Sequence, residues 1–257
     1  MTFDLEGRTA LVTGASRGIG RSVAEALAAA GASVALHHSG RDPEAAEALA
    51  AVCGHGARPF AADLGERDAP QALWDAVALY YGSVDVVVNN AGIFRTAPLD
   101  APLDAWLDVW DETLDVNLRA AAVLCHAAAR HAAERSDEAG VRVRVVNVSS
   151  RAAFRGDDPQ HLAYAASKGG LVALTKSLAR GLGREGLVAF GVAPGFTETD
   201  MAAEAIAQHG DALRAQIALD RLTRPDDIAP IVLLLASGLA DHATGTTIDV
   251  NAGSYVR

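Results

Sequence analysis

The stretch TALVTGASRGIG, residues 9–20, decides the fold. Residues 9–13 form a short apolar run that ends at a glycine, which is typical of a buried strand. A helix is expected over residues 19–30, because Gly31 supplies a helix-ending signal, and a second strand over residues 33–37. A strand, a glycine turn, a helix and a second strand make a right-handed βαβ unit with parallel strands.

The glycines of this turn predict a ligand. Gly14, Gly18 and Gly20 lack a Cβ, so the backbone could approach a pyrophosphate closely, and free N–H groups at the start of the next helix would meet the anion. The spacing is GxxxGxG rather than GxGxxG. A tight turn without a ligand is the alternative interpretation.

The alternation of strands and helices continues along the chain. Further strands are expected at residues 57–61, 85–89, 142–148, 187–192 and 246–250. Further helices are expected at residues 43–53, 69–81, 103–133 (either continuous or broken near Pro102), 162–182 and 226–236. The pattern predicts an α/β fold: a single Rossmann-type, doubly wound, seven-stranded, mostly parallel sheet with helices on both faces. No linker divides the chain, so residues 1–257 are expected to form one domain.

Composition excludes several classes of protein. The net charge of −10 argues against nucleic acid or an anionic membrane as partner. The two cysteines, Cys53 and Cys125, lack CxxC spacing and are expected to be reduced core thiols, which indicates a cytoplasmic protein. We find neither a signal-like N-terminus nor an apolar run of membrane-spanning length. His126 and His131 are five residues apart, a poor spacing for one metal, and we expect no catalytic metal.

The stretch YAASK, residues 164–168, pairs a tyrosine with a lysine one helical turn away. A lysine ammonium beside a phenol favours the phenolate and so lowers a pKa that is normally about 10. Such a tyrosine could exchange protons near neutral pH. An exposed helix pair without function is the alternative, because the spacing alone is common.

Several motifs together resemble those of the short-chain dehydrogenase/reductase family, over essentially the whole chain. In family order they are TGASRGIG at residues 13–20, Asp63-Leu64, NNAG at residues 89–92, Asn117, Ser149-Ser150, YAASK and Pro194-Gly195. Within the family, the chain looks most like 3-oxoacyl-(acyl-carrier-protein) reductases, through TGASRGIG, NNAG, YAASKGG and APGFTETDM.

The resemblance implies four catalytic roles. Tyr164 would be the general acid/base, and Lys168 would depress its pKa and bind the nicotinamide ribose. Ser150 would hydrogen-bond the substrate oxygen, and Asn117 would hold a water that links Lys168 to solvent; satisfying backbone groups is the alternative for Asn117. The family serine usually precedes the tyrosine by thirteen residues, where this chain has Arg151, so choosing Ser150 implies one extra residue in the loop at 151–163.

The resemblance also implies the cofactor-binding residues. In the glycine turn they are Gly14, Ser16, Arg17, Gly18, Ile19 and Gly20. Beyond it they are Asp63 and Leu64 at the adenine, Asn90, Ala91 and Gly92 at close backbone approach, Tyr164 and Lys168 at the ribose, and Pro194, Gly195, Thr197 and Thr199 at the nicotinamide. Turn formation is the alternative for Asp63, and helix N-capping is an additional role for Thr199.

The segment after the second strand predicts NADP(H). An NAD site generally places an acid there, but residues 36–41 read LHHSGR and the first acid, Asp42, comes too late. The 2′-phosphate would instead meet Arg17 and Arg41, with His38 and Ser39 as further donors. Solvated loop residues are the alternative for both arginines.

The substrate is left open by the sequence. Residues 94–110, 151–163 and 197–222 should wall the pocket, and its Trp106, Trp110 and Phe154 suggest an apolar component. A carrier-bound 3-oxoacyl chain would need a basic surface, for which Arg130, Arg135, Arg142 and Arg144 are candidates; free ketones or secondary alcohols are equally open. We expect an NADPH-dependent ketone reductase, by family resemblance a homotetramer. A non-catalytic nucleotide-binding scaffold and an epimerase or dehydratase are the alternatives.

Overall fold

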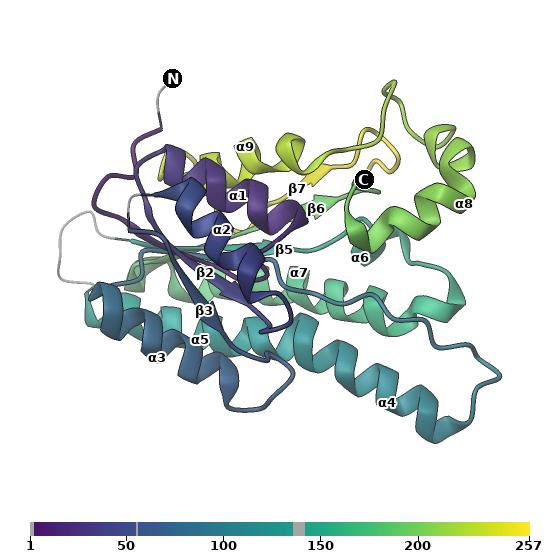
Figure 1. Cartoon of the computed structure of the whole chain (residues 1–257), viewed down its shortest axis with the longest axis horizontal. Coiled ribbons are helices and arrows are strands. Elements are labelled where there is room, and N and C mark those ends of the chain that lie inside the picture. Colours follow the sequence, from purple (N-terminus) through teal and green to yellow (C-terminus); the bar gives the residue numbers. More distant parts are fainter. Residues whose placement is uncertain (1–2, 55, 136–141) are drawn as a thin grey trace.

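A seven-stranded sheet lies at the centre of the computed structural model, which describes residues 3–54, 56–135 and 142–257 (Figure 1). The strand order is β3-β2-β1-β4-β5-β6-β7, and every described pair is parallel. The strands are β1 (Thr9–Val12), β2 (Ser33–His38), β3 (Arg58–Ala61), β4 (Val86–Asn89), β5 (Val143–Val148), β6 (Leu187–Pro194) and β7 (Thr247–Val250). The predicted doubly wound fold is confirmed, with a parallel sheet throughout.

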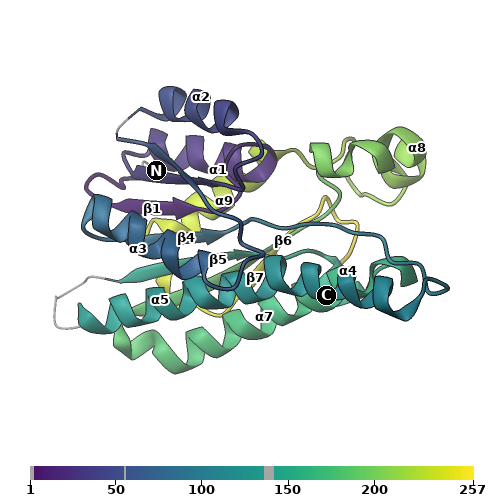
Figure 2. The ribbon, with the colours of Figure 1, turned by 60° about the horizontal axis from the view of Figure 1, so that its bottom comes forward.

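Helices cover both faces of the sheet (Figure 2). They are α1 (Gly18–Ala29), α2 (Pro43–Cys53), α3 (Ala69–Tyr81), α4 (Leu103–Leu114), α5 (Ala120–Glu134), α6 (Ala152–Arg155), α7 (Leu162–Leu182), α8 (Ala203–Arg214) and α9 (Pro225–Ala236). In the described part of the chain, no helix combines the length and the apolar character that crossing a membrane requires.

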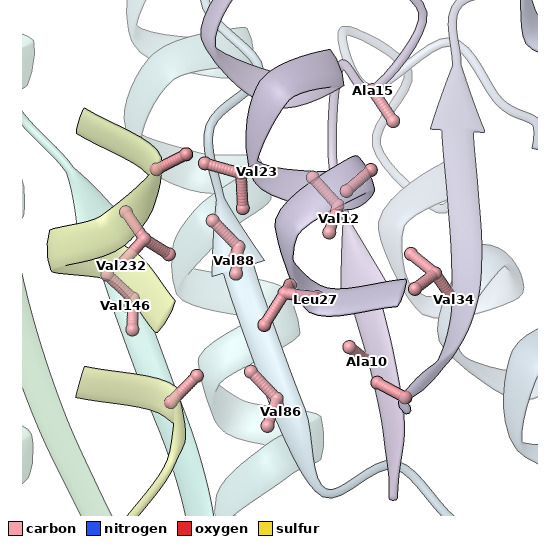
Figure 3. Packing of buried hydrophobic residues seen from close by; sticks show 14 of the residues in the cluster. Ala10, Val12, Ala15, Val23, Leu27, Val34, Val86, Val88, Val146 and Val232 are labelled. Carbon is pink, nitrogen blue, oxygen red and sulfur yellow. The ribbon is translucent and has the colours of Figure 1, made fainter. Parts of the chain in front are cut away.

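Alternation along each strand divides the core in two. Ala10 and Val12 of β1 face a cluster with α1, α2 and α9, in which Val23, Leu27 and Val232 are fully buried (Figure 3). Leu11, between them, faces a second cluster with α3, α5 and α7. Because side chains of a strand point alternately to opposite faces, β1 and its parallel neighbours carry apolar residues on both sides.

Local end signals explain where several helices begin and end. The Asp42 side chain accepts a hydrogen bond from the Ala45 amide at 3.0 Å and caps α2, whose first residue is Pro43. Gly82 ends α3 in the left-handed conformation, with φ of 81°. The bounds predicted for α2, α3 and α7 agree with the structure.

The region predicted as one helix over residues 103–133 is two helices joined by a π-helical turn, Asp115–Arg119. The interruption lies at Asn117 and not at Pro102, which directly precedes α4. Within this turn the Asn117 side chain hydrogen-bonds the backbone of Ile93, from Ile93 N to Oδ1 at 2.7 Å and from Nδ2 to Ile93 O at 2.9 Å. The wide turn therefore places this side chain against the segment that follows β4.

Candidate active site

The glycine turn after β1 is held by the segment that follows β4. The Thr13 hydroxyl accepts hydrogen bonds from the amides of Asn90 and Ala91, each at 2.9 Å. The Asn90 side chain in turn donates to Thr13 O at 2.9 Å. Two motifs far apart in the sequence thus meet where the strand order reverses, beside β1, which is where such sheets bind dinucleotides.

The turn itself has the shape of an anion cradle. Gly14 and Gly18 have φ of 64° and 55°, in the left-handed region that favours glycine. A Cβ on Gly20 would lie 2.2 Å from Gly14 O, so this position admits no larger residue without movement. No side chain caps the start of α1, whose first residues include Ile19, so its N–H groups fit a pyrophosphate.

His37, at the end of β2, also holds the turn, a role that the sequence analysis missed. Its Nδ1 accepts from the Gly14 amide at 3.0 Å, and its Nε2 lies 3.0 Å from Ala62 O. Because a carbonyl only accepts, Nε2 carries the proton and the ring is neutral. Burial is the main cause that lowers the pKa of His37, to about 4. The one available signal was a polar residue within an apolar strand that adjoins the turn.

The residues expected at the adenosine end follow β2 and β3. His38 is buried and its Nδ1 accepts from the Gly40 amide at 3.2 Å, whereas Ser39 and Arg41 are exposed. Asp63 Oδ1 accepts from the Gly65 amide at 3.0 Å, so it forms the turn that was its alternative role. Two further expected residues, Leu64 and Ser16, are buried and half-buried respectively.

Tyr164 and Lys168 lie on α7, and Ser150 is the second residue after the end of β5. Ser150 hydrogen-bonds Tyr164, while Phe94 packs edge-on against the phenol ring with centroids 4.8 Å apart. The Lys168 Nζ donates to Val148 O at 2.9 Å and lies 5.8 Å from the centroid of the Tyr164 ring. The structure therefore brings together the three groups expected to do the chemistry.

Burial is the main influence on the pKa of Tyr164 in this structure, and the expected effect of Lys168 stays a prediction. Burial raises the pKa of Tyr164 to about 12, the hydrogen bond from Ser150 opposes that rise, and Asp157 adds to it. Burial also lowers the pKa of Lys168 to about 8. Lys168 directs its Nζ to Val148 O and lies 5.8 Å from the centroid of the Tyr164 ring, and burial outweighs any effect that it has on the phenol. Tyr164 consequently holds its proton at neutral pH.

Asn117 and Gly92 complete this cluster. A Cβ on Gly92 would lie 3.2 Å from Asn117 Oδ1 and 3.4 Å from Lys168 Nζ, so the three residues meet. The Asn117 side chain also donates to the Ser167 hydroxyl at 3.2 Å. These contacts correspond to the alternative role, satisfaction of neighbouring polar groups; the expected water-holding role stays a prediction.

The segment after β6 reaches from the sheet to the glycine turn. A Cβ on Gly195 would lie 2.9 Å from Asn251 Cα, so the chain after Pro194 passes close to the end of β7. Thr197 is buried and its hydroxyl donates to Gly195 O at 3.2 Å. A Cβ on Gly18 would lie 3.2 Å from Thr199 Cγ2, which places Thr199 beside the glycine turn.

Other residues singled out in the sequence make aromatic contacts within the chain, and their expected place in the pocket wall stays a prediction. Trp106 and Trp110 stack on α4 with centroids 5.1 Å apart, and Phe154 lies under the Arg257 guanidinium at 3.7 Å. The segment 197–222 contains α8, a helix that was not predicted and buries only Leu213. Among the residues that the structure describes, no three His, Cys, Asp or Glu side chains are grouped as metal ligands.

Comparisons with known proteins agree with this geometry. The family model described as "Enoyl-(Acyl carrier protein) reductase" matches residues 14–255. The chain is 38% identical to a D-threitol dehydrogenase of Mycolicibacterium smegmatis, covering 99% of this chain and 95% of the relative. It is 36% identical to the 3-oxoacyl-[acyl-carrier-protein] reductase FabG of Staphylococcus aureus, covering 97% of this chain and 98% of the relative. A short chain dehydrogenase from Burkholderia cenocepacia, solved in complex with NADP, is 38% identical, covers 97% of this chain and 98% of its own, and has a TM-score of 0.86.

Proposed function

The chain belongs to the short-chain dehydrogenase/reductase family, and from that premise we propose that it is an NADP(H)-dependent oxidoreductase that interconverts a ketone and a secondary alcohol. One observation carries the proposal. Tyr164, Lys168 and Ser150 lie together at the carboxyl edge of the sheet that also bears the glycine turn. A scaffold need not retain this set, and an epimerase or dehydratase, the other alternative, would leave the cofactor unchanged overall.

Each residue of the cluster has a distinct part in the proposed reaction. Tyr164, which holds its proton at neutral pH, donates it to the carbonyl oxygen during reduction and accepts it during oxidation. Ser150 hydrogen-bonds the same oxygen and orients it. Lys168 binds the nicotinamide ribose and, when its Nζ leaves Val148 O, favours the phenolate. The nicotinamide, when bound, supplies or takes up the hydride.

The choice of NADP(H) rests on the segment after β2. Asp42, the first acid there, is engaged as the cap of α2 and accepts from Ala45 N at 3.0 Å. The described residues 39–41, directly after β2, carry no carboxylate that could bind a ribose 2′-hydroxyl. Arg17 and Arg41 are exposed and suited to a 2′-phosphate, and the solved relative from Burkholderia cenocepacia holds NADP.

A free small molecule is the better substrate candidate than a carrier-bound acyl chain. Three of the four arginines proposed as a carrier surface are engaged within the chain. Arg135 contacts Asp85 at 3.1 Å, Arg142 donates to Gly183 O at 2.8 Å, and Arg144 pairs with Asp241 at 2.9 Å. Arg142 and Arg144 also lie at the start of β5, the opposite end of that strand from Ser150. One relative is named for D-threitol and another for a 3-oxoacyl group on acyl carrier protein. Sequence similarity alone therefore does not decide between a free and a carrier-bound substrate.

We further propose a single domain that assembles as a homotetramer in the cytoplasm. The family resemblance suggests packing of long helices across two-fold axes. Leu103 and Leu107 on α4 are 68% and 40% exposed, which is compatible with such a contact. Both cysteines are free and buried, which agrees with a reducing compartment.

The Tyr164→Phe variant tests the proposed function. It should lower turnover by ~10²–10⁴-fold, the usual contribution of a general acid, and should retain NADPH binding. NADPH oxidation with a panel of ketones, and NADPH fluorescence for binding, measure the two effects. Tyr80→Phe, at an exposed position on α3, is the matched control. Near-normal turnover by Tyr164→Phe at saturating substrate would reject the assignment.

A further inference from the structure

Arg151, which follows Ser150 directly, is a buried cation that no carboxylate of the described residues contacts. Only 4% of the residue is exposed. Within the described residues its guanidinium has no hydrogen-bond partner and no carboxylate at ion-pair distance, and its Nη2 is fully enclosed. Its one side-chain contact of note is with the ring of Phe196, whose centroid lies 4.5 Å from the guanidinium carbon.

Such an arrangement is unfavourable unless an anion completes it. A buried charge loses its hydration, and an aromatic face replaces only part of that interaction. Burial lowers the pKa of Arg151 to about 10, so the side chain remains cationic at neutral pH. The nearest acid, Asp157, is in ion-pair contact with Arg155 at 3.8 Å instead. A bound anion would supply the contact that no described carboxylate makes with Arg151.

The position of Arg151 indicates which molecule. Its amide donates to Pro194 O at 3.0 Å, so its backbone lies beside the segment expected to line the nicotinamide. Asp157 acts electrostatically on both Arg151 and Tyr164, so all three lie in one neighbourhood. The glycine turn that would hold the cofactor phosphates follows β1, two strands away from β5, a separation of roughly 10 Å. The anion consequently belongs to the substrate rather than to the cofactor phosphates.

We propose that Arg151 binds a carboxylate of the substrate, and that the enzyme interconverts a hydroxy acid and the corresponding oxo acid. This inference rests on the proposed function and narrows its substrate class. A carboxylate fits because one guanidinium fork matches two oxygens. A phosphate dianion is disfavoured by the nearby Asp157, and an acyl thioester has no negative charge to offer beside its carbonyl.

The reaction balances with the carboxylate unchanged. The carbinol carbon of the hydroxy acid loses a hydride to NADP⁺, and its hydroxyl loses a proton through Tyr164 to solvent. The products are the oxo acid, NADPH and one proton. Arg151 takes no part in these transfers; it fixes the end of the substrate that does not react.

The test compares acids with alditols of the same chain length. Gluconate is paired with glucitol and threonate with threitol, each with NADP⁺, and kcat/KM is measured for wild type, Arg151→Met, Arg151→Lys and Arg184→Met. Arg184 is exposed just before β6, far from Arg151, and controls for the loss of one positive charge. We expect at least tenfold preference for an acid in wild type. The acid-to-alditol ratio should fall at least tenfold in Arg151→Met, recover in part in Arg151→Lys and remain unchanged in Arg184→Met.

Binding is measured separately, so that the result does not depend on turnover or on one variant. Succinate, which has no hydroxyl to oxidise, should compete with the acid substrate in wild type, and gluconate should raise the melting temperature of wild type with NADP⁺ but not that of Arg151→Met. Equal use of acids and alditols, an unchanged ratio in Arg151→Met, or no binding of any acid would overturn the inference. Turnover of neutral ketones alone would overturn it and leave the proposed function intact. Absence of nicotinamide turnover with every alcohol and ketone would instead overturn the proposed function.

Discussion

The Nδ1 atom of His37 accepts a hydrogen bond from the Gly14 amide at 3.0 Å, so one side chain of β2 fixes the turn that follows β1. The same residue accepts from the Ala15 amide through its backbone carbonyl at 2.8 Å. Its Nε2 binds Ala62 O, one residue before Asp63. A single imidazole thus connects three segments around the proposed cofactor site.

Two substitutions at His37 separate its two contacts. His37→Asn keeps an acceptor near Nδ1, whereas His37→Gln keeps a donor near Nε2 and leaves the Gly14 amide unpaired. An unpaired buried donor costs ~1–3 kcal/mol, so the Gln variant should bind NADPH roughly tenfold or more weakly than the Asn variant. NADPH fluorescence titration measures both, with His242→Asn, on the 3-10 turn Asp241–Ala243, as control. Equal affinities of the Asn and Gln variants would contradict this role.

The neutral state of His37 predicts a pH dependence of stability. Its pKa is about 4 in the folded chain and 6.5 when unfolded, so the unfolded chain takes up this proton first as the pH falls. The contribution of neutral His37 to the free energy of unfolding is complete above pH 6.5. It is lost as the pH falls towards 4, and the total loss is roughly 3 kcal/mol. His38 lowers and Asp63 raises this pKa as secondary causes. Urea denaturation should show the wild-type advantage over His37→Asn shrinking by this amount between pH 7 and 4; parallel profiles would refute the prediction.

Arg17 should discriminate between the two dinucleotides. Its side chain is 76% exposed and contacts Asp200 only loosely, at 3.9 Å, so it is available to a 2′-phosphate. Losing a hydrogen bond to a charged group costs ~1.5–3 kcal/mol, so Arg17→Ala should weaken NADPH tenfold or more and leave NADH nearly unchanged. Arg184→Ala is the charge-matched control. Comparable losses for both cofactors would reject the phosphate contact, and a wild-type preference for NADH would reject the cofactor assignment.

Gly20 should tolerate no side chain. A Cβ there would lie 2.2 Å from Gly14 O, and such overpacking costs ~1–3 kcal/mol or pushes α1 away from the turn. Gly20→Ala should therefore weaken NADPH binding at least tenfold and lower the melting temperature. In Gly181→Ala, on α7, the new Cβ meets nothing within 4 Å, and stability should rise by about 0.5–1 kcal/mol. NADPH binding to Gly20→Ala at wild-type strength would show that the turn is looser than described.

The assembly has a direct test in solution. One chain has a mass of 26.5 kDa, and multi-angle light scattering at micromolar concentration should give about four times that value. A mass near that of one chain would refute the homotetramer, and twice that mass would replace it with a dimer.

Elements with strong local signals were predictable from the sequence. The capped α2, with Asp42 before Pro43, and the glycine-ended α3 were predicted with their observed bounds. The helix α8 was missed because Gly210 lies within it, its backbone departs from helical geometry at His209, and only Leu213 is buried. The start of α9 at Pro225 was predicted one residue late.

Site residues that lie in a recognisable sequence motif were predictable. Contacts between residues that are distant in the sequence were not. Tyr164, Lys168 and Ser150 were placed by motif, and the structure brings them together. His37 needed the register of two strands, in which Leu36 lies opposite Val12, before its bond to Gly14 could be foreseen. The burial that raises the pKa of Tyr164, and the hydrogen bond from Lys168 to Val148 O, likewise depend on tertiary packing that no local pattern records.

The π-helical turn Asp115–Arg119 has a consequence for comparing this chain with its relatives. A π turn holds about one residue more than an α turn, so α4 and α5 are out of phase by roughly 100° about their common axis. The segment has the form of a one-residue insertion that the helix absorbed without breaking. If a relative has an unbroken α-helix in this region, an alignment without a gap at residues 115–119 would misplace either α4 or α5 by one position. A chain lacking that residue would turn Asn117 away from Ile93, so the length of this segment is itself a marker of the site.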